Sequence, residues 1–388
     1  MKSVALTQLL QYDLNAKNLH SEQSVSIMSD ITSGRIPQSE IADIPIKYLD
    51  LTNIPGVPQQ NIMTPSTAYK PFRYEFGFIA HQHQNKIHWM HDEIQLGEDV
   101  KDWKSKLTNG EKNLLTKIFP LFVQNDFLIQ NVYIHEYARL FRPNELKMGF
   151  SALANMEAIH QIAYAYLLDE IGFTDDQYSE FLKYKEMIDK YNFTAGYRPD
   201  TLMGIAVALV VFGALTEGVQ LFASFLTLFN FQRFNKMKGM GQIVSLSVRD
   251  ESFHVSFVAE IFKTFMREYG HLIDLEKLWS AIDIAARGIV TGEHLFADLA
   301  FEQGPIEGMD AAGLKQYICS IADMRLNQFG LSKIYNVENP YSWSNSLMGG
   351  IEHVNFFEQR STSYAKAATK GTWQSAWEKR DLRRKISI

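Results

Sequence analysis

The feature that most restricts the fold of this chain is a long apolar run, residues 205–229, which reads IAVALVVFGALTEGVQLFASFLTLF. The run is long enough to cross a bilayer. However, Glu217 stands at its middle, where an ionisable group would be costly in lipid. A helix that is apolar on every side is equally expected at the centre of a large helical protein. We therefore predict a buried core helix, with a membrane span as the alternative.

Beyond Trp103 the sequence is typical of a helical protein. Apolar residues recur at helical spacing over long segments, and turn signals such as Thr108-Asn109-Gly110 separate them. Alternating strand patterns are nearly absent. We predict an all-α bundle with long helices over about 111–141, 145–171, 174–190, 201–229, 239–269 and 275–303, and further helices to about 357.

The chain divides into three regions by composition. Residues 1–66 carry scattered prolines without periodicity, which indicates an irregular N-terminal extension. Residues 67–357 form the predicted helical domain. Residues 358–388 are polar and then basic and lack an apolar face, so we expect a flexible C-terminal tail that serves a partner.

Composition limits the compartment and the partners. A chain of 388 residues, 46% of them hydrophobic, can bury a substantial core. Its net charge of −6 gives no general attraction for nucleic acid or an anionic membrane. The N-terminal residues lack the apolar run of an export signal. We expect a cytoplasmic protein with a soluble partner.

Two segments carry the same short pattern, in which a carboxylate and an imidazole lie three residues apart on one helix face. These are Glu157-Ala158-Ile159-His160 and Glu251-Ser252-Phe253-His254. A third match, Glu268 with His271, runs into a glycine where its helix should end, so we interpret it as coincidence. One such motif alone is weak evidence for a site.

A second acid precedes each good match inside a long apolar helix. Asp126 lies 31 residues before Glu157, and Glu217 lies 34 before Glu251. Antiparallel helices of that length return to the same height, so each half can point two carboxylates and one imidazole at a shared interior point, as in ferritin-like dimetal bundles. The predicted metal ligands are Asp126, Glu157, His160, Glu217, Glu251 and His254.

The predicted ligand set indicates which metals fit. Four carboxylates buried together would repel one another and lose solvation, whereas two divalent cations would cancel their charge. Oxygen and imidazole ligands without thiolate favour iron or manganese over structural zinc. We expect two metal ions per chain, with iron as the first expectation and manganese as the alternative.

Four blocks of sequence resemble those of one enzyme family: KIHWMHDEIQLGEDVKDW, NMEAIHQIAYAYLLDEIG, FNKMKGMGQIVSLSVRDESFH and NFFEQRSTSYAKA. Over about residues 69–364 the chain resembles the small, radical-generating subunit of class I ribonucleotide reductase. The resemblance implies that a dimetal centre activates molecular oxygen and generates a tyrosyl radical. It also implies that the oxidising equivalent passes to a large subunit that reduces ribonucleotides to deoxyribonucleotides. Homodimers are usual in that family.

Tyr164 is the candidate for the radical. It follows His160 by four residues, so it lies only about 40° from that ligand around the helix, whereas Tyr166 lies near 240° and points elsewhere. The resemblance implies that apolar packing shields the radical, and the candidates for that packing are Leu221, Phe222 and Phe225. Without the resemblance, an ordinary buried tyrosine is the alternative.

Three further residues are assigned by resemblance to a radical-transfer route. Trp89 resembles the relay tryptophan, and Asp250 resembles the acid that links it to His160 and fixes the imidazole tautomer. Tyr364 resembles the tail tyrosine that hands the radical to the large subunit. The chain departs from the family after Tyr364, where a basic tail follows. Trp373 and Trp377 could form one face of a helix induced by a partner, or the tail could be merely solvated.

The substrate must bind to another chain. The family's chemistry needs a thiyl radical and a reducing thiol pair, and Cys319, expected to be a small buried side chain, is the only cysteine. No convincing glycine-rich phosphate loop is present. The alternatives are a ferritin-like dimetal oxygenase or ligand-binding oxidase, and an iron-storage or structural bundle. The sequence leaves open whether an activating flavoprotein is required.

Overall fold

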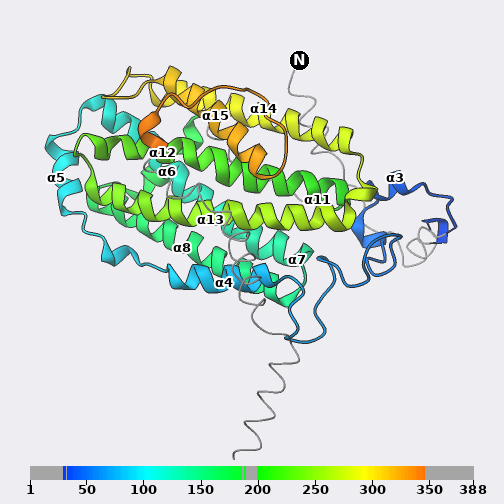
Figure 1. Ribbon diagram of the computed structural model, residues 1–388. Coiled ribbons are helices and arrows are strands. Elements are labelled where there is room, and N and C mark those ends of the chain that lie inside the picture. Colours follow the sequence, from blue (N-terminus) through cyan, green and yellow to red (C-terminus); the bar gives the residue numbers. More distant parts are fainter. Residues whose placement is uncertain (1–28, 32, 186–187, 189–198, 346–388) are drawn as a thin grey trace, which may run out of the picture. The chain divides into compact units, whose positions relative to one another are not determined.

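The computed structural model describes residues 29–31, 33–185, 188 and 199–345, and this part of the chain contains helices and no strands (Figure 1). Its only β-type pairings are isolated bridges, Pro45 with Thr201 and Ile306 with Met309. The predicted all-α bundle is therefore confirmed. Long helices lie side by side along one direction and enclose the core (Figure 1).

The apolar run forms the central helical segment, which consists of α11 (Leu202–Leu209), η5 (Val210–Gln220) and α12 (Leu221–Arg233). The Thr201 hydroxyl accepts a hydrogen bond from Gly204 N and so caps its start. Although this is the one described helix long and apolar enough to span a membrane, 89% of its most apolar window is buried inside the protein. The prediction of a core helix is confirmed.

Four further helical segments surround this core. They are α6 (Asn109–Asn131) with its continuations η3 (Val132–Tyr137) and α7 (Ala138–Leu140), then α8 (Asn144–Ile171), α13 (Lys238–Tyr269) and α14 (Leu275–Ala300). Their ends follow ordinary capping rules: Thr108 and Glu111 form a capping box before α6, and Gly172 ends α8 at φ 93°. Helix α15 (Ala311–Gln328) packs against α14 and η5.

Shorter elements complete the described chain. Helix α4 (Glu75–Lys86) packs along α8, and α5 (Gly97–Ser105) contacts both α8 and α13. Neither was among the predicted helices. The remaining short elements are α3 (Gln38–Ile41), η1 (Ile46–Tyr48), η2 (His91–Glu93), α9 (Asp175–Tyr178), η4 (Glu180–Lys183) and η6 (Gly270–Leu272).

The prediction of one helix over 174–190 is wrong. The described part of that segment contains α9 and η4, separated at Ser179, and then helical residues at 185 and 188 after a break at Tyr184. None of the residues in 174–190 whose burial is described is buried, and Leu182 is 52% exposed, so these residues offer no apolar stripe packed against the bundle to hold a long helix together.

The chain divides into two compact units, Met1–Ser342 and Trp343–Ile388. The first unit contains every helix named above. The predicted domain boundary at 357 lies outside the described residues.

Candidate metal centre

The six predicted ligands come together in the interior of the first unit. Asp126 comes from α6, Glu157 and His160 from α8, Glu217 from η5, and Glu251 and His254 from α13, and all six are buried. They form two overlapping groups in which one donor atom per residue lies within 4.8 Å of the others. The groups are Asp126, Glu157, His160 and Glu251, and Glu157, Glu217, Glu251 and His254. Glu157 and Glu251 belong to both.

Both imidazoles direct Nδ1 at the two shared carboxylates. His254 Nδ1 lies 2.8 Å from Glu157 Oε1 and 3.3 Å from Glu251 Oε2. His160 Nδ1 lies 3.0 Å from Glu251 Oε1 and 3.7 Å from Glu157 Oε2. These contacts arrange donor atoms around common points, as the coordination of two neighbouring cations requires.

Oxygen atoms in this cluster lack the hydrogen bonds that burial demands. Among the described residues, no donor with hydrogen-bond geometry serves Asp126 Oδ2, Glu217 Oε2 or either carboxylate oxygen of Glu157 and Glu251. Buried carboxylates left in this way are strongly destabilising unless a cation or a proton compensates them. Oxygen and nitrogen donors without thiolate suit iron and manganese. The cluster therefore fits a dimetal site.

The surroundings of the cluster shift the pKa values of four of its members. Burial, reinforced by Glu157, raises the pKa of Asp126 well above its usual range. Burial also raises the pKa of Glu217, against the opposing effect of His254. Burial lowers the pKa values of His160 and His254, but their carboxylate partners outweigh it, so both are raised well above the usual range. Burial therefore favours the protonated carboxyls, and the carboxylate partners favour the protonated imidazoles, so a metal would compete with protons for these donor atoms.

Glu217 lies on a helical segment that departs from α geometry. Residues Val210–Gln220 form a π-helix, a geometry that is rare and is frequently found at functional sites. Arg325 of α15 packs against it: a Cβ added at Gly218 would lie 2.8 Å from Arg325 Cγ, and Arg325 Nε donates to Gly218 O at 3.2 Å. The glycine allows this close approach, which the sequence did not reveal.

Trp89, Asp250 and His160 form one connected chain of contacts. Trp89 is buried, and its Nε1 donates to Asp250 Oδ2 at 2.8 Å. The same oxygen lies 3.2 Å from His160 Nε2. Burial opposes ionisation of Asp250, but the hydrogen bonds with His160 and Trp89 and the charges of His160 and Arg249 together outweigh burial and lower the pKa of this carboxyl. An ionised Asp250 between the two rings leaves His160 Nδ1 to face the other carboxylates.

Tyr164 is fully buried and shielded from water by aromatic rings. Its hydroxyl donates to Ser247 Oγ at 3.3 Å, and its ring packs against Phe122 with centroids 5.0 Å apart. Phe225 packs in turn on Phe122, and Phe222 packs edge-on against Phe225. The predicted shielding residues Leu221, Phe222 and Phe225 are all buried.

Sequence reasoning missed three residues that contact Tyr164 or a member of the cluster, although their spacing offered a signal. Phe122 precedes Asp126 by four residues, Ser247 precedes Glu251 by four, and Tyr133 follows Asp126 by seven. Each interval returns to the same face of a helix as the ligand. Tyr133 is buried, and its hydroxyl donates to Glu217 Oε1.

Other sequence candidates have different positions. Glu268 accepts hydrogen bonds from Tyr74 and from Ile62 N, and His271 is exposed, in agreement with a coincidental motif. The expectation that Cys319 is buried is wrong: it is partly exposed, with Sγ 3.6 Å from His294 Nε2. Tyr364, Trp373 and Trp377 lie outside the described residues.

Known proteins resemble this chain over most of its length. The family model described as ribonucleotide reductase, small chain, matches residues 66–340. A probable ribonucleoside-diphosphate reductase small subunit of invertebrate iridescent virus 3 is 36% identical over 334 residues, which cover 81% of this chain and 89% of the viral protein.

Solved structures share the fold. The ribonucleotide reductase R2 subunit from Clostridium botulinum matches with a TM-score of 0.66 and 20% identity, over 74% of this chain and 94% of that one. The Rnr4 homodimer from Saccharomyces cerevisiae matches with a TM-score of 0.62 and 20% identity, over 88% and 99%. A dimanganese(II) NrdF from Streptococcus sanguinis matches at 0.59 and 16% identity, over 71% and 95%.

Proposed function

Because this chain belongs to the ribonucleotide reductase small-chain family, we propose that its carboxylate and imidazole cluster holds two metal ions and oxidises Tyr164 to a radical. Membership of the family makes the chain one subunit of an oxidoreductase that reduces ribonucleoside diphosphates. The observation that carries the proposal is the pair of overlapping ligand groups, each complete and buried.

We assign Asp126, Glu157, His160 and Glu251 to one ion and Glu157, Glu217, Glu251 and His254 to the other. When bound, two iron or manganese ions supply the redox chemistry by which molecular oxygen is activated. Iron is the first candidate. Manganese is supported by the fold shared with the dimanganese(II) NrdF from Streptococcus sanguinis. The chain itself supplies neutralising charge and an interior site closed to bulk water.

Tyr164 keeps its proton until it is oxidised. Burial raises the pKa of the phenol far above its ordinary value, so the neutral form persists at physiological pH. Losing an electron must therefore coincide with loss of the hydroxyl proton, because a buried phenol cation would be costly. The Phe122 ring against Tyr164 excludes water, which would otherwise quench the radical.

Export of the oxidising equivalent follows the chain from His160 through Asp250 to Trp89. Asp250 accepts a hydrogen bond from Trp89 Nε1 and lies within hydrogen-bond distance of His160, so a proton shift at the carboxylate can accompany electron transfer. We propose that Tyr364, in the C-terminal tail, continues the route to the large subunit. We propose the same regions as above: an N-terminal extension over 1–66, the helical domain over 67–357 and the tail over 358–388.

Two kinds of partner are proposed, a large subunit and a second copy of this chain. A single cysteine cannot supply a thiyl radical and a reducing pair, so the large subunit binds and reduces the nucleotide. We also propose a homodimer in the cytoplasm. Large apolar side chains remain nearly half exposed on adjoining elements, Phe127 on α6, Ile134 on η3 and Ile162 on α8, and a second copy would cover them.

Electron paramagnetic resonance of metal-loaded, oxygen-exposed protein tests this proposal. We expect a tyrosyl radical in the wild type and none in Tyr164→Phe, with equal metal content in both. Tyr166→Phe is the matched control, because that partly exposed ring packs against His91 instead of the cluster. An undiminished radical signal in Tyr164→Phe would contradict the assignment, and metal-loaded wild type without any radical would favour an oxidase.

A further inference from the structure

One buried phenol beside the cluster has no part in the mechanism above. Tyr133 lies in η3, where α6 passes into a π-helical segment, and it is 1% exposed. Its hydroxyl donates to Glu217 Oε1, and its ring lies edge-on to His254 with centroids 5.9 Å apart. Tyr133 therefore touches the two residues that belong to only one of the two ligand groups, the group without Asp126 and His160.

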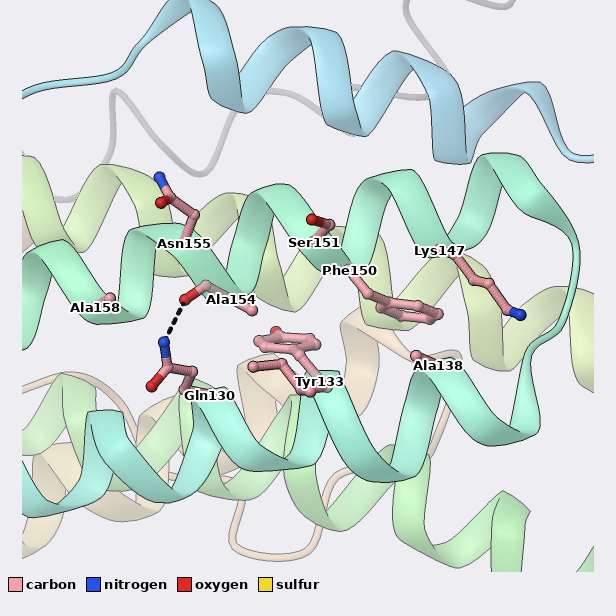
Figure 2. A pocket seen from close by; sticks show the side chains of 10 residues that line it. Gln130, Tyr133, Ala138, Lys147, Phe150, Ser151, Ala154, Asn155 and Ala158 are labelled. Carbon is pink, nitrogen blue, oxygen red and sulfur yellow. Dashed lines mark hydrogen bonds between the residues drawn. The ribbon is translucent and has the colours of Figure 1, made fainter.

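Tyr133 also lines a pocket of about 380 Å³ between α6 with η3 and α8 (Figure 2). Gln130, Lys147, Phe150, Ser151 and Asn155 are among its other lining residues. Phe150 stacks on Tyr133 with centroids 6.2 Å apart and an interplanar angle of 27°. Tyr133 thus lines the pocket, whereas Glu217 and His254 do not.

We propose that Tyr133 is a positioning residue for the metal ion held by Glu217 and His254: its hydroxyl orients the Glu217 carboxylate. The inference rests on the proposed dimetal site. It concerns a residue that holds a ligand, and assigns Tyr133 no contact with a metal.

The hydrogen bond leaves one oxygen of Glu217 for a cation. Tyr133 serves Oε1, whereas Oε2 has no hydrogen-bond partner in the described chain. Each ligand group thus has one member held by a residue outside the cluster. Tyr133 holds Glu217 in one group, and Asp250 holds the His160 ring in the other. Removal of such supports typically weakens metal binding about 10–100-fold.

Mn²⁺ titration of the metal-free, full-length chain tests the proposal, with free Mn²⁺ followed by electron paramagnetic resonance. We expect two ions per wild-type chain. In Tyr133→Phe, which keeps the ring and removes the donor, we expect one dissociation constant to rise about tenfold or more and the other to stay unchanged.

Two matched variants separate the hydrogen bond from general loss of a hydroxyl. Tyr133→4-aminophenylalanine retains a donor at the same ring position, so we expect it to restore tight binding of both ions. Tyr269→Phe removes another buried hydroxyl, which donates to Asn61 Oδ1 at 2.7 Å and lies on α13 about 22 Å beyond His254. We expect it to bind two ions as the wild type does.

Several outcomes would overturn the inference. Two unchanged dissociation constants in Tyr133→Phe would show that the hydroxyl is not needed. An equal rise of both dissociation constants would indicate that the hydroxyl has a general structural role. If Tyr133→Phe does not fold, the 4-aminophenylalanine variant decides: weak binding of one ion there contradicts the proposal and two tight ions support it. Wild type that binds fewer than two ions would instead overturn the dimetal site itself, and this inference with it.

Discussion

The two halves of the cluster repeat one design in different surroundings. The half with Asp126 and His160 is built from α-helical segments, and a chain of hydrogen-bonding contacts leads from it to Trp89. The half with Glu217 and His254 takes its carboxylate from the π-helix η5 and is bounded by Tyr133 of a second π-helical segment, η3. The two halves therefore need not have the same role although their ligand types are the same. The residues around each half determine whether an electron and a proton can be passed on from it.

This difference suggests separate duties. In the first half, Tyr164 follows His160 by about one helical turn and a chain of contacts leads toward Trp89, which would suit the proposed oxidation and export. In the second half, the buried Tyr133 hydroxyl donates to Glu217, and the Tyr133 ring lines a pocket. This arrangement would suit the proposed positioning of the second ion. Glu157 and Glu251 belong to both ligand groups and should therefore be needed by both halves.

The largest expected effect comes from substituting Glu251, which belongs to both ligand groups. Glu251→Gln keeps the side-chain shape but removes a charge that both ligand groups use, so we expect the chain to lose tight binding of both ions. Glu217→Gln removes a carboxylate from one group only and should leave one tight ion. Metal content after gel filtration, measured by elemental analysis, checks both. Equal metal content in the two variants would contradict the shared role of Glu251.

A smaller effect should separate export from radical formation. Trp89→Phe removes the Nε1 donor to Asp250 but leaves all six ligands in place. We expect nucleotide reduction with a matching large subunit to fall about 10–100-fold, while metal content and the Tyr164 radical yield stay near wild type. Assay of deoxyribonucleotide formation beside the resonance spectrum checks this. Full activity in Trp89→Phe would exclude the proposed route.

The last expected effect is a pH dependence that both halves should share. The raised pKa values of Asp126, Glu217, His160 and His254 mean that these groups hold their protons to higher pH in the metal-free chain than they ordinarily would. Metal binding must release those protons, so affinity should rise with pH, by about tenfold per pH unit for each proton released. Calorimetry of Mn²⁺ binding in buffers of different ionisation enthalpy counts the protons. Affinity that does not change with pH would contradict these proton assignments.

Much of the fold could be predicted because it follows from apolar periodicity. The core helix and the long helices of the bundle occur where the spacing placed them. The π-helical geometry of η5 and η3 could not be predicted, because one extra residue in a turn hardly changes an apolar pattern on a helix that is buried all round. The segment after Thr174 was mistaken for a long helix because periodicity says nothing of whether a partner surface is available.

The candidate site also has a part that could be predicted from the sequence and a part that could not. Repeated carboxylate and imidazole spacing was enough to select six side chains that the fold brings together. Contacts between different helices were harder: Arg325 against Gly218, and Tyr133 with Glu217, join residues 107 and 84 positions apart. Such pairs depend on helix packing, which a single sequence does not specify. The sequence offered a signal only where a residue lies a whole number of helical turns from a predicted ligand, as Phe122 and Tyr133 do from Asp126.

The most direct test of the central claim is anomalous X-ray scattering from crystals of the full chain loaded with Mn²⁺. Two peaks per chain are expected, one among Asp126, Glu157, His160 and Glu251 and one among Glu157, Glu217, Glu251 and His254. A single peak, or peaks away from these residues, would contradict a dimetal centre built from two halves that share Glu157 and Glu251.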